Sequence, residues 1–226
     1  MQKMLASVAQ AFRPAKEAGL KPCPTLRVMR RAGTIAAVTV MAAIVSAARP
    51  AAQGPVKVRV QTELGDIVME IDAKRAPNTA ANFLRYLNAG HYDGGTFHRT
   101  VKMDNQPDSP VKIEVIQAGV NPDRAKEGFP PILLERTSVT GLRHTDGVIS
   151  MARGGADSAT SGWFICINDQ PSLDYGGARN PDGQGFAAFG RVVQGMDVVR
   201  KIQQAPNTDA QRLTPPIRIL KVSIIG

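Results

Sequence analysis

Cysteine is scarce in this chain, with two residues in 226, Cys23 and Cys166. Cys23 lies in a segment interpreted below as a leader, so a processed protein would keep Cys166 alone and form no internal disulfide. This excludes a disulfide-stapled fold and leaves the redox compartment undecided. Cys166 lies in the apolar run Trp163–Ile167, and we interpret it as a small buried hydrophobic residue.

Aromatic residues are also few, at 5% of the chain, with one tryptophan. The net charge of +9 would by itself suit a nucleic-acid partner or a membrane surface. However, seven of the basic residues and only one acidic residue lie in residues 1–48. The remainder has no dense lysine and arginine run interleaved with stacking aromatics, so we expect no nucleic-acid partner.

The chain lacks the spacings that metal sites and hydrolases require. His91, His98 and His144 show no metal-ligand or triad spacing, and Ser150 lies in a strand-like run without a nucleophile elbow. We therefore expect no metal and no cofactor, and we interpret His98 as structural. The loop 174–185 contains asparagine and aspartates but no ordered calcium-loop spacing, so cation binding there is only a minor alternative.

An N-terminal leader is predicted over residues 1–48. The basic pair Arg30 and Arg31 precedes a 17-residue uncharged run, residues 32–48, in which Ser46 and Ala48 fit the −3 and −1 positions of a signal-peptidase site. We expect cleavage after Ala48 and an exported protein, periplasmic or secreted. The run is short and rich in alanine, so retention as a membrane anchor through residues 32–48 is the alternative.

The start of this leader is unusual, because 29 residues precede the basic pair. Signal sequences normally begin close to the first residue of the chain, which leads to the hypothesis that Met29 is the true start. The arginine pair also suggests a twin-arginine route, although the flanking residues lack the fuller pattern.

A short linker, residues 49–54, separates this leader from a single domain over residues 55–226. The domain opens with two alternating runs joined by a turn, and an amphipathic helix follows near Pro77–Gly90. Short strand-like runs come next, then a helix over Gly195–Gln203 and a closing strand over Ile217–Ile225. Without βαβ alternation, this order predicts an all-β closed sheet. Its strand-like runs are Thr96–Val101, Val111–Gln117, Gly147–Ala152, Trp163–Ile167 and Phe186–Val193.

Five short segments follow one another in the domain: Phe97-His98-Arg99, Val115-Ile116-Gln117-Ala118-Gly119, Gly147-Val148-Ile149-Ser150-Met151-Ala152, Trp163-Phe164-Ile165 and Phe189-Gly190-Arg191-Val192. In this order they resemble the cyclophilin family of peptidyl-prolyl cis/trans isomerases. The resemblance runs from Val56 to Ile225 and rests on the order of its segments rather than on one motif. It implies an eight-stranded antiparallel barrel capped by two α-helices, with the active groove on the outer face.

The resemblance also implies roles for individual residues. It makes Arg99 the catalytic hydrogen-bond donor to the prolyl nitrogen and Gln117 the side chain that grips a substrate carbonyl. It makes Phe164 the apolar floor under the proline ring and Leu173 a wall of the pocket. Ala152 would offer its backbone to the peptide. Such a reaction needs no covalent intermediate and no cofactor.

The sequence departs from the family pattern around this pocket. An insert over Lys102–Lys112 replaces a shorter loop, and residues 174–185 form a second insert. Arg153 would place a second cation beside Arg99 and favour acidic residues near the proline, the alternative being an exposed loop arginine. Where the family has a Phe-Met pair, this chain has Glu114 and Val115. Where the family has Gln, Asn, Trp and His, this chain has, in that order, Gly162, Arg153, Ser172 and Phe186.

Two functions are consistent with these residues. The first is an isomerase that assists the folding of exported proteins, with proline-containing polypeptides as clients. The second is a cyclophilin-like peptide-binding module or chaperone with little catalysis, which the altered ring pocket favours. A monomer is expected in either case, because the chain has no long heptad pattern.

Overall fold

The computed structural model describes residues 55–208 and 211–225. The predicted leader, its cleavage site, the linker and the alternative start at Met29 therefore lie outside the described residues. Within the described ranges, no helix is long and apolar enough to cross a bilayer.

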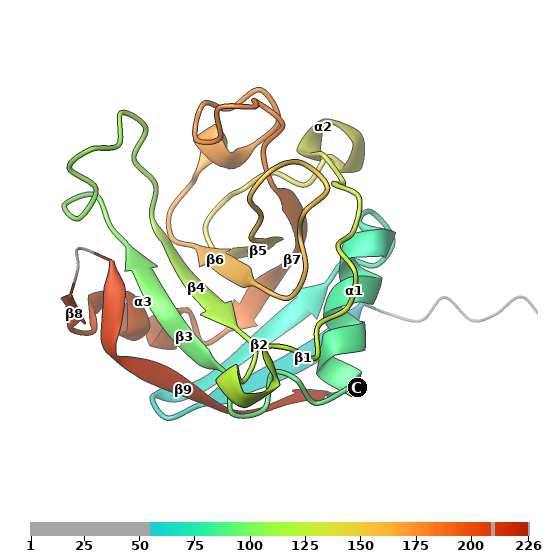
Figure 1. Ribbon diagram of the computed structural model, residues 1–226, viewed down its shortest axis with the longest axis vertical. Coiled ribbons are helices and arrows are strands. Elements are labelled where there is room, and N and C mark those ends of the chain that lie inside the picture. Colours follow the sequence, from blue (N-terminus) through green and yellow to red (C-terminus); the bar gives the residue numbers. More distant parts are fainter. Residues whose placement is uncertain (1–54, 209–210, 226) are drawn as a thin grey trace, which may run out of the picture. The chain divides into compact units, whose positions relative to one another are not determined.

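One antiparallel sheet forms the body of the domain (Figure 1). Its strand order is β1-β2-β7-β5-β6-β4-β3-β9-β8, and an additional pairing of β1 with β9 closes it. Eight strands thus make a closed barrel, and β8 is a two-residue strand paired with β9. The strands are β1 (Val56–Thr62), β2 (Gly65–Ile71), β3 (Thr96–Val101), β4 (Val115–Gly119), β5 (Val148–Met151), β6 (Trp163–Cys166), β7 (Ala187–Gln194), β8 (Asn207–Thr208) and β9 (Arg212–Ile224).

The two longer helices agree with the sequence prediction. Helix α1 (Pro77–Asn88) begins with proline in its first turn, where the missing N–H would have no partner inside the helix. The carboxylate of Glu135, far along the chain, accepts from the backbone N–H groups of Asn78 and Thr79 at 3.0 and 2.8 Å. Helix α3 (Met196–Gln204) follows β7 directly. A further four-residue helix, α2 (Thr137–Thr140), was not predicted.

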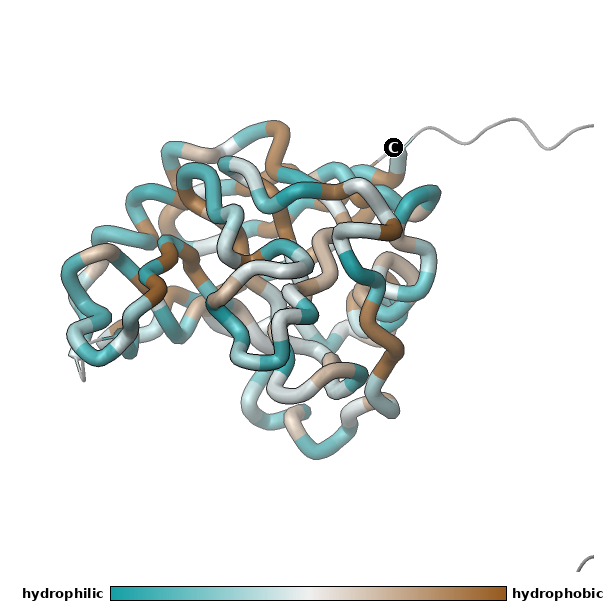
Figure 2. The backbone as a smooth tube through the Cα atoms, turned by 90° about the horizontal axis from the view of Figure 1, so that it is seen from above, coloured by the Kyte–Doolittle hydropathy of each residue, from teal (hydrophilic) through white to brown (hydrophobic). Residues whose placement is uncertain are grey.

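The core fills the inside of the barrel and the space under α1. Phe83 of α1 is fully buried, and its ring contacts those of Tyr92, Trp163 and Phe189 at centroid distances of 5.2, 5.8 and 5.2 Å. Hydrophobic and hydrophilic residues alternate along much of the chain trace (Figure 2). This alternation places one face of each strand in the core and leaves the other face for the outer surface.

Two strand boundaries differ from the prediction for physical reasons. Residues 111–114 are not in β4, because Gln106 binds the backbone of Ile113 and holds this stretch in the loop after β3. Strand β9 starts at Arg212 and runs through Pro215 and Pro216, before the predicted start of this strand at Ile217. Both prolines are exposed, and proline is tolerated in a strand where its missing N–H would face solvent.

Candidate functional site

A row of four side chains crosses the outer face of the barrel. Arg99 of β3 pairs with Gln117 of β4, Gln117 pairs with Phe164 of β6, and Phe164 pairs with Ser150 of β5. Directly paired residues of antiparallel strands point to the same side of the sheet. Their strand neighbours, such as Ile116 and Ile165, are in the barrel core. The outer row therefore gathers three of the predicted site residues from three strands.

Arg99 is held from both sides by glutamines. Its Nη1 donates to Oε1 of Gln117 at 3.0 Å, while Nε and Nη2 donate to Oε1 of Gln211 at 2.9 and 2.6 Å. Burial lowers the pKa of the Arg99 guanidinium, and the nearby charge of Arg179 lowers it further. Because the free-arginine pKa is far above 7, the group remains a cation. The guanidinium is thus a half-buried charge in a fixed position.

The apolar residues predicted for the pocket also come together. Phe164 and Leu173 belong to a small buried cluster outside the barrel core, and Ala152 and Phe186 pack against it. The ring of Phe186 meets that of Phe164 edge-on, with centroids 5.5 Å apart and an interplanar angle of 88°. Cys166 belongs to the same cluster and is fully buried, which confirms its interpretation as a hydrophobic residue. Burial raises the pKa of its thiol.

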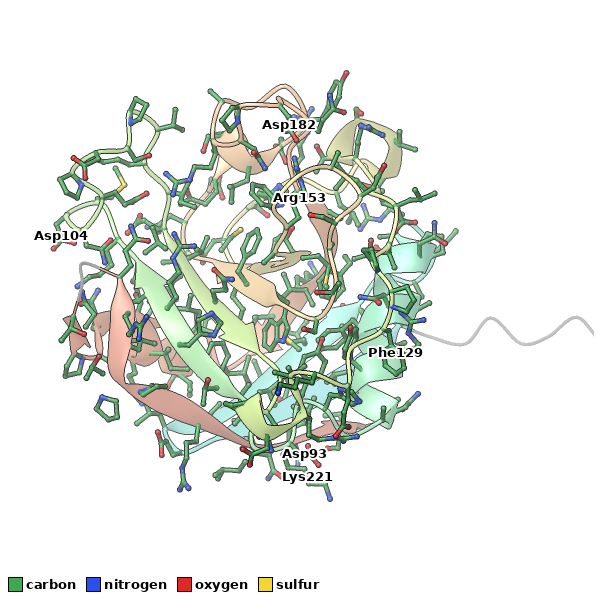
Figure 3. All side chains as sticks on the ribbon, in the orientation of Figure 1. Asp93, Asp104, Phe129, Arg153, Asp182 and Lys221 are labelled. Carbon is green, nitrogen blue, oxygen red and sulfur yellow. The ribbon has the colours of Figure 1, made fainter. Side chains whose placement is uncertain are left out.

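Arg153 does not have the environment that we predicted for it. Its side chain is only 1% exposed and forms a two-pronged ion pair with Asp182, at 2.7 Å to Oδ2 and 2.9 Å to Oδ1 (Figure 3). Its Nε donates to the carbonyl of Gly185, and its guanidinium lies 5.1 Å from the ring centroid of Phe186. The hydrogen bonds from Arg153 lower the pKa of Asp182 to about 2. The alternative of an exposed loop arginine is therefore wrong, and the carboxylate of Asp182 offsets the charge that was predicted to act beside Arg99.

A buried hydrogen-bonded chain lies behind Phe164. Nε2 of His144 is 2.9 Å from Oγ of Ser150, and Nδ1 of His144 is 2.8 Å from Oδ1 of Asp174. These residues are 1%, 0% and 4% exposed, so no substrate reaches this serine. Burial acts to raise the pKa of Asp174, but hydrogen bonds from the His144 ring and backbone outweigh it and lower the pKa. The His144 ring lies nearly parallel to Phe164, at 6.2 Å and 15°, and supports the floor of the site.

His98 lies beside Arg99 in β3 and has no role in the row. Burial lowers the pKa of its imidazole, and the charges of Arg99 and Arg212 act in the same direction. A neutral imidazole beside a fixed cation is consistent with the structural interpretation of His98.

Two residues near Arg99 escaped the sequence analysis. Gln211 is 112 positions along the chain from Arg99, and Arg179 lies in the second insert. Nη1 of Arg179 donates to Oγ of Ser109 and to the carbonyl of Val111 in the first insert, at 2.5 and 2.6 Å. No local sequence pattern predicts the role of either residue. Both roles depend on contacts with residues far along the chain, and these contacts form only when the barrel closes.

Two hollows on the surface lie away from this row. One of about 720 Å³ borders the ends of β2 and β7 and includes Lys74, Arg143 and Arg191, and one of about 330 Å³ lies beside α1. Neither is lined by a residue predicted for the site. Among the residues with described positions, no group of three or more His, Cys, Asp or Glu side chains is arranged to hold a metal ion.

Comparison with known proteins points to one family for this chain. The family model described as cyclophilin type peptidyl-prolyl cis-trans isomerase/CLD matches residues 57–224. A peptidyl-prolyl cis-trans isomerase of Streptomyces antibioticus is 36% identical over 148 residues, which is 65% of this chain and 82% of the relative. Peptidyl-prolyl cis-trans isomerase B of Escherichia coli is 35% identical over 147 residues, 65% of this chain and 83% of the relative.

The fold has solved counterparts as well. A cyclophilin type peptidyl-prolyl cis-trans isomerase of Cryptosporidium parvum, crystallised in the presence of the dipeptide Ala-Pro, superposes with a TM-score of 0.61. The alignment covers 75% of this chain and 99% of that one, at 21% sequence identity, and so supports the fold alone. Taken with the family match over nearly the whole described domain, the barrel and its outer row show that this chain belongs to the cyclophilin-type peptidyl-prolyl cis-trans isomerases.

Proposed function

We propose that Arg99, Gln117 and Phe164 perform the isomerisation on the outer face of the barrel. Rotation about an X-Pro bond meets a barrier of about 18–20 kcal/mol, because amide resonance resists twisting. As the bond twists, the prolyl nitrogen loses conjugation and becomes a hydrogen-bond acceptor, so a fixed donor stabilises the twisted state more than the planar one. The observation that carries the proposal is the guanidinium of Arg99, held between two glutamines beside Phe164.

The contacts of Gln117 support its role in holding the peptide. Its Oε1 already accepts a hydrogen bond from Arg99. The Nε2 donor is therefore the atom left for a substrate carbonyl. The edge-on pair of Phe164 and Phe186 offers an apolar surface for the proline ring next to that donor. A rate enhancement of about 10⁵ corresponds to about 7 kcal/mol, of which one charge-assisted donor supplies about half.

The Arg99→Ala substitution tests this assignment. We expect kcat/KM on an Ala-Pro peptide to fall by about 10²–10³-fold, the usual cost of removing one donor to a developing charge. Protease-free measurement of cis/trans exchange by NMR checks the rate, and circular dichroism checks the fold. Arg99→Lys keeps the charge but not both glutamine contacts, so an intermediate rate is expected.

The same experiment separates the enzyme from a peptide-binding module. A module with little catalysis would bind the peptide without exchange above the spontaneous rate, and Arg99→Ala would leave that rate unchanged. A folded Arg99→Ala variant with wild-type kcat/KM would disprove the role given to Arg99.

We also propose that this isomerase acts on exported proline-containing polypeptides as a monomer. The support is the basic pair followed by the uncharged run over residues 32–48, with small residues at its end. Cell fractionation with N-terminal sequencing of the mature chain checks this, and Arg49 is expected as its first residue. Recovery of the uncleaved chain in the membrane fraction would favour the anchored alternative.

A further inference from the structure

Arg179 joins the two long loops beside the site. Its backbone N–H donates to the carbonyl of Ser172 at 3.1 Å, which fixes it to the base of its own loop. Its Nη1 donates across to Ser109 and Val111 in the insert after β3. The side chain is half-buried, and Nε and Nη2 make no hydrogen bond with any described residue. Two nitrogens that can donate hydrogen bonds therefore remain free.

Arg99 is connected to the same insert from the other side. Gln211, which accepts from Arg99, donates through Nε2 to the carbonyl of Asn105 at 3.2 Å. Gln106 is 2% exposed and closes the insert by binding the backbone of Lys102 and Ile113. The guanidinium of Arg179 thus contacts this short, internally braced segment directly, and that of Arg99 is connected to it through Gln211. Burial and the charge of Arg179 together lower the pKa of Arg99, as expected for two nearby cations.

The charges of these two arginines are not compensated by any described residue. Their partners are the oxygens of amides, a hydroxyl and a backbone carbonyl, all of them uncharged. Asp104 and Asp108 lie exposed on the insert and form no ion pair with either guanidinium. Eight other arginines of the described ranges do lie within 4 Å of a carboxylate: Arg59, Arg75, Arg124, Arg143, Arg153, Arg191, Arg200 and Arg218.

We propose that Arg99 and Arg179 together form an anion subsite that selects peptides with an acidic side chain next to the proline. A carboxylate placed there accepts charge-assisted hydrogen bonds from the free nitrogens of Arg179 and relieves the repulsion between the two cations. A basic side chain at the same place adds a third positive charge and is disfavoured. This inference rests on the proposed function, because that function places the peptide beside Arg99.

The test compares peptides that differ only in the residue before proline. Acetylated, amidated peptides containing Glu-Pro, Gln-Pro or Lys-Pro carry no terminal charge that could occupy the subsite. Cis/trans exchange measured by NMR gives kcat/KM for each. We expect Glu-Pro to exceed Lys-Pro by about tenfold at low salt, with Gln-Pro between them, and the ratio to shrink as ionic strength rises.

Arg179 variants then identify the cause of the preference. Arg179→Met should bring the Glu-Pro to Gln-Pro ratio close to one, because it removes the charge and the free donors of the subsite. Arg179→Lys should keep most of the preference, because it keeps the charge. Arg191→Gln removes an exposed arginine of β7 and should keep the wild-type ratio. Equal rates for all three wild-type peptides, or equal loss of preference in Arg179→Met and Arg179→Lys, would overturn the proposal.

A failure of the proposed function would look different. If no peptide isomerised above the spontaneous rate, that function would be wrong, while peptide affinity could still be measured by calorimetry. Tighter wild-type binding of the Glu-Pro peptide, lost in Arg179→Met, would then support the subsite, and equal affinities would overturn it.

Discussion

Gln211 is the residue that fixes the orientation of the Arg99 guanidinium from the side opposite Gln117. One oxygen of Gln211 accepts two of the three hydrogen bonds that Arg99 makes with glutamines. An arginine side chain has several rotatable bonds, and the loss of these contacts would let it sample other rotamers. Under the proposed function, Gln211 would act on the reaction through Arg99, as a positioning residue.

The Gln211→Ala substitution should therefore lower kcat by about tenfold with a smaller change in KM. The reason is that a displaced donor fails to stabilise the twisted bond, whereas the peptide contacts of Gln117 and Phe164 remain. Steady-state kinetics on an Ala-Pro peptide gives the two constants separately. Gln211→Glu keeps an acceptor oxygen and should recover most of kcat. Gln204→Ala, on the exposed side of α3, is the matched control and should keep the wild-type kcat. Wild-type kcat in Gln211→Ala would contradict the role.

At the scale of elements, the insert after β3 is held closed by hydrogen bonds between its own residues. Gln106 donates to the carbonyls of Lys102 and Ile113 and accepts from the N–H of Ile113, all inside the loop. The insert supports Gln211 through Asn105 and Arg179 through Ser109 and Val111. The loop at upper left in Figure 1 is therefore one wall of the site rather than an unrelated surface extension.

Gln106→Ala should open this loop without unfolding the barrel. The N–H and the carbonyl of buried Ile113 would lose their partner, at a cost of about 1–3 kcal/mol for each group that water does not reach, while the Lys102 carbonyl would keep the N–H of Asn105. Hydrogen exchange monitored by mass spectrometry should show faster exchange over residues 102–113 and unchanged exchange in β5 and β6. Met103→Ala, at an exposed position of the same loop, is the control. Unchanged exchange over the insert in Gln106→Ala would refute the closure.

At the scale of the whole molecule, acid should destabilise the fold by protonating the carboxylates whose pKa is lowered in the folded state. Hydrogen bonds from Arg153 lower the pKa of Asp182 to about 2, and the pKa of Asp174 is also lowered. A carboxylate with a depressed folded pKa contributes stability above its unfolded pKa of about 3.9, and that contribution is lost as pH falls through the folded pKa.

We therefore expect the free energy of unfolding to decrease from about pH 4 to pH 2, and the Asp182→Asn variant to show a shallower decrease. Urea unfolding followed by the fluorescence of Trp163, the one tryptophan of the chain, measures both. Asp108→Asn, an exposed position on the first insert, should keep the wild-type slope. The same slope in Asp182→Asn and wild type would show that the Arg153 pair contributes nothing.

Much of the fold follows from the sequence alone. Alternation of period two places Trp163 and Ile165 in the core and Phe164 and Cys166 outside it, and this depends only on the geometry of an extended strand. Proline at the start of α1 and the glycine before α3 likewise mark their elements locally. The order of the motifs, through the family resemblance, predicted the barrel. The strand pairing of that barrel places Arg99, Gln117 and Phe164 in one row.

Only the tertiary structure decided which groups neutralise, hold or support those residues. Arg153 is paired with Asp182, Arg99 is held by Gln211, and Ser150, His144 and Asp174 form one buried chain. Each contact depends on where a distant loop lies after the sheet closes, and no periodicity along the chain encodes that. The sequence by itself therefore determined the barrel and the residues of its outer row, whereas closure of the barrel determined their charge environment, because electrostatic partners are chosen by distance in space.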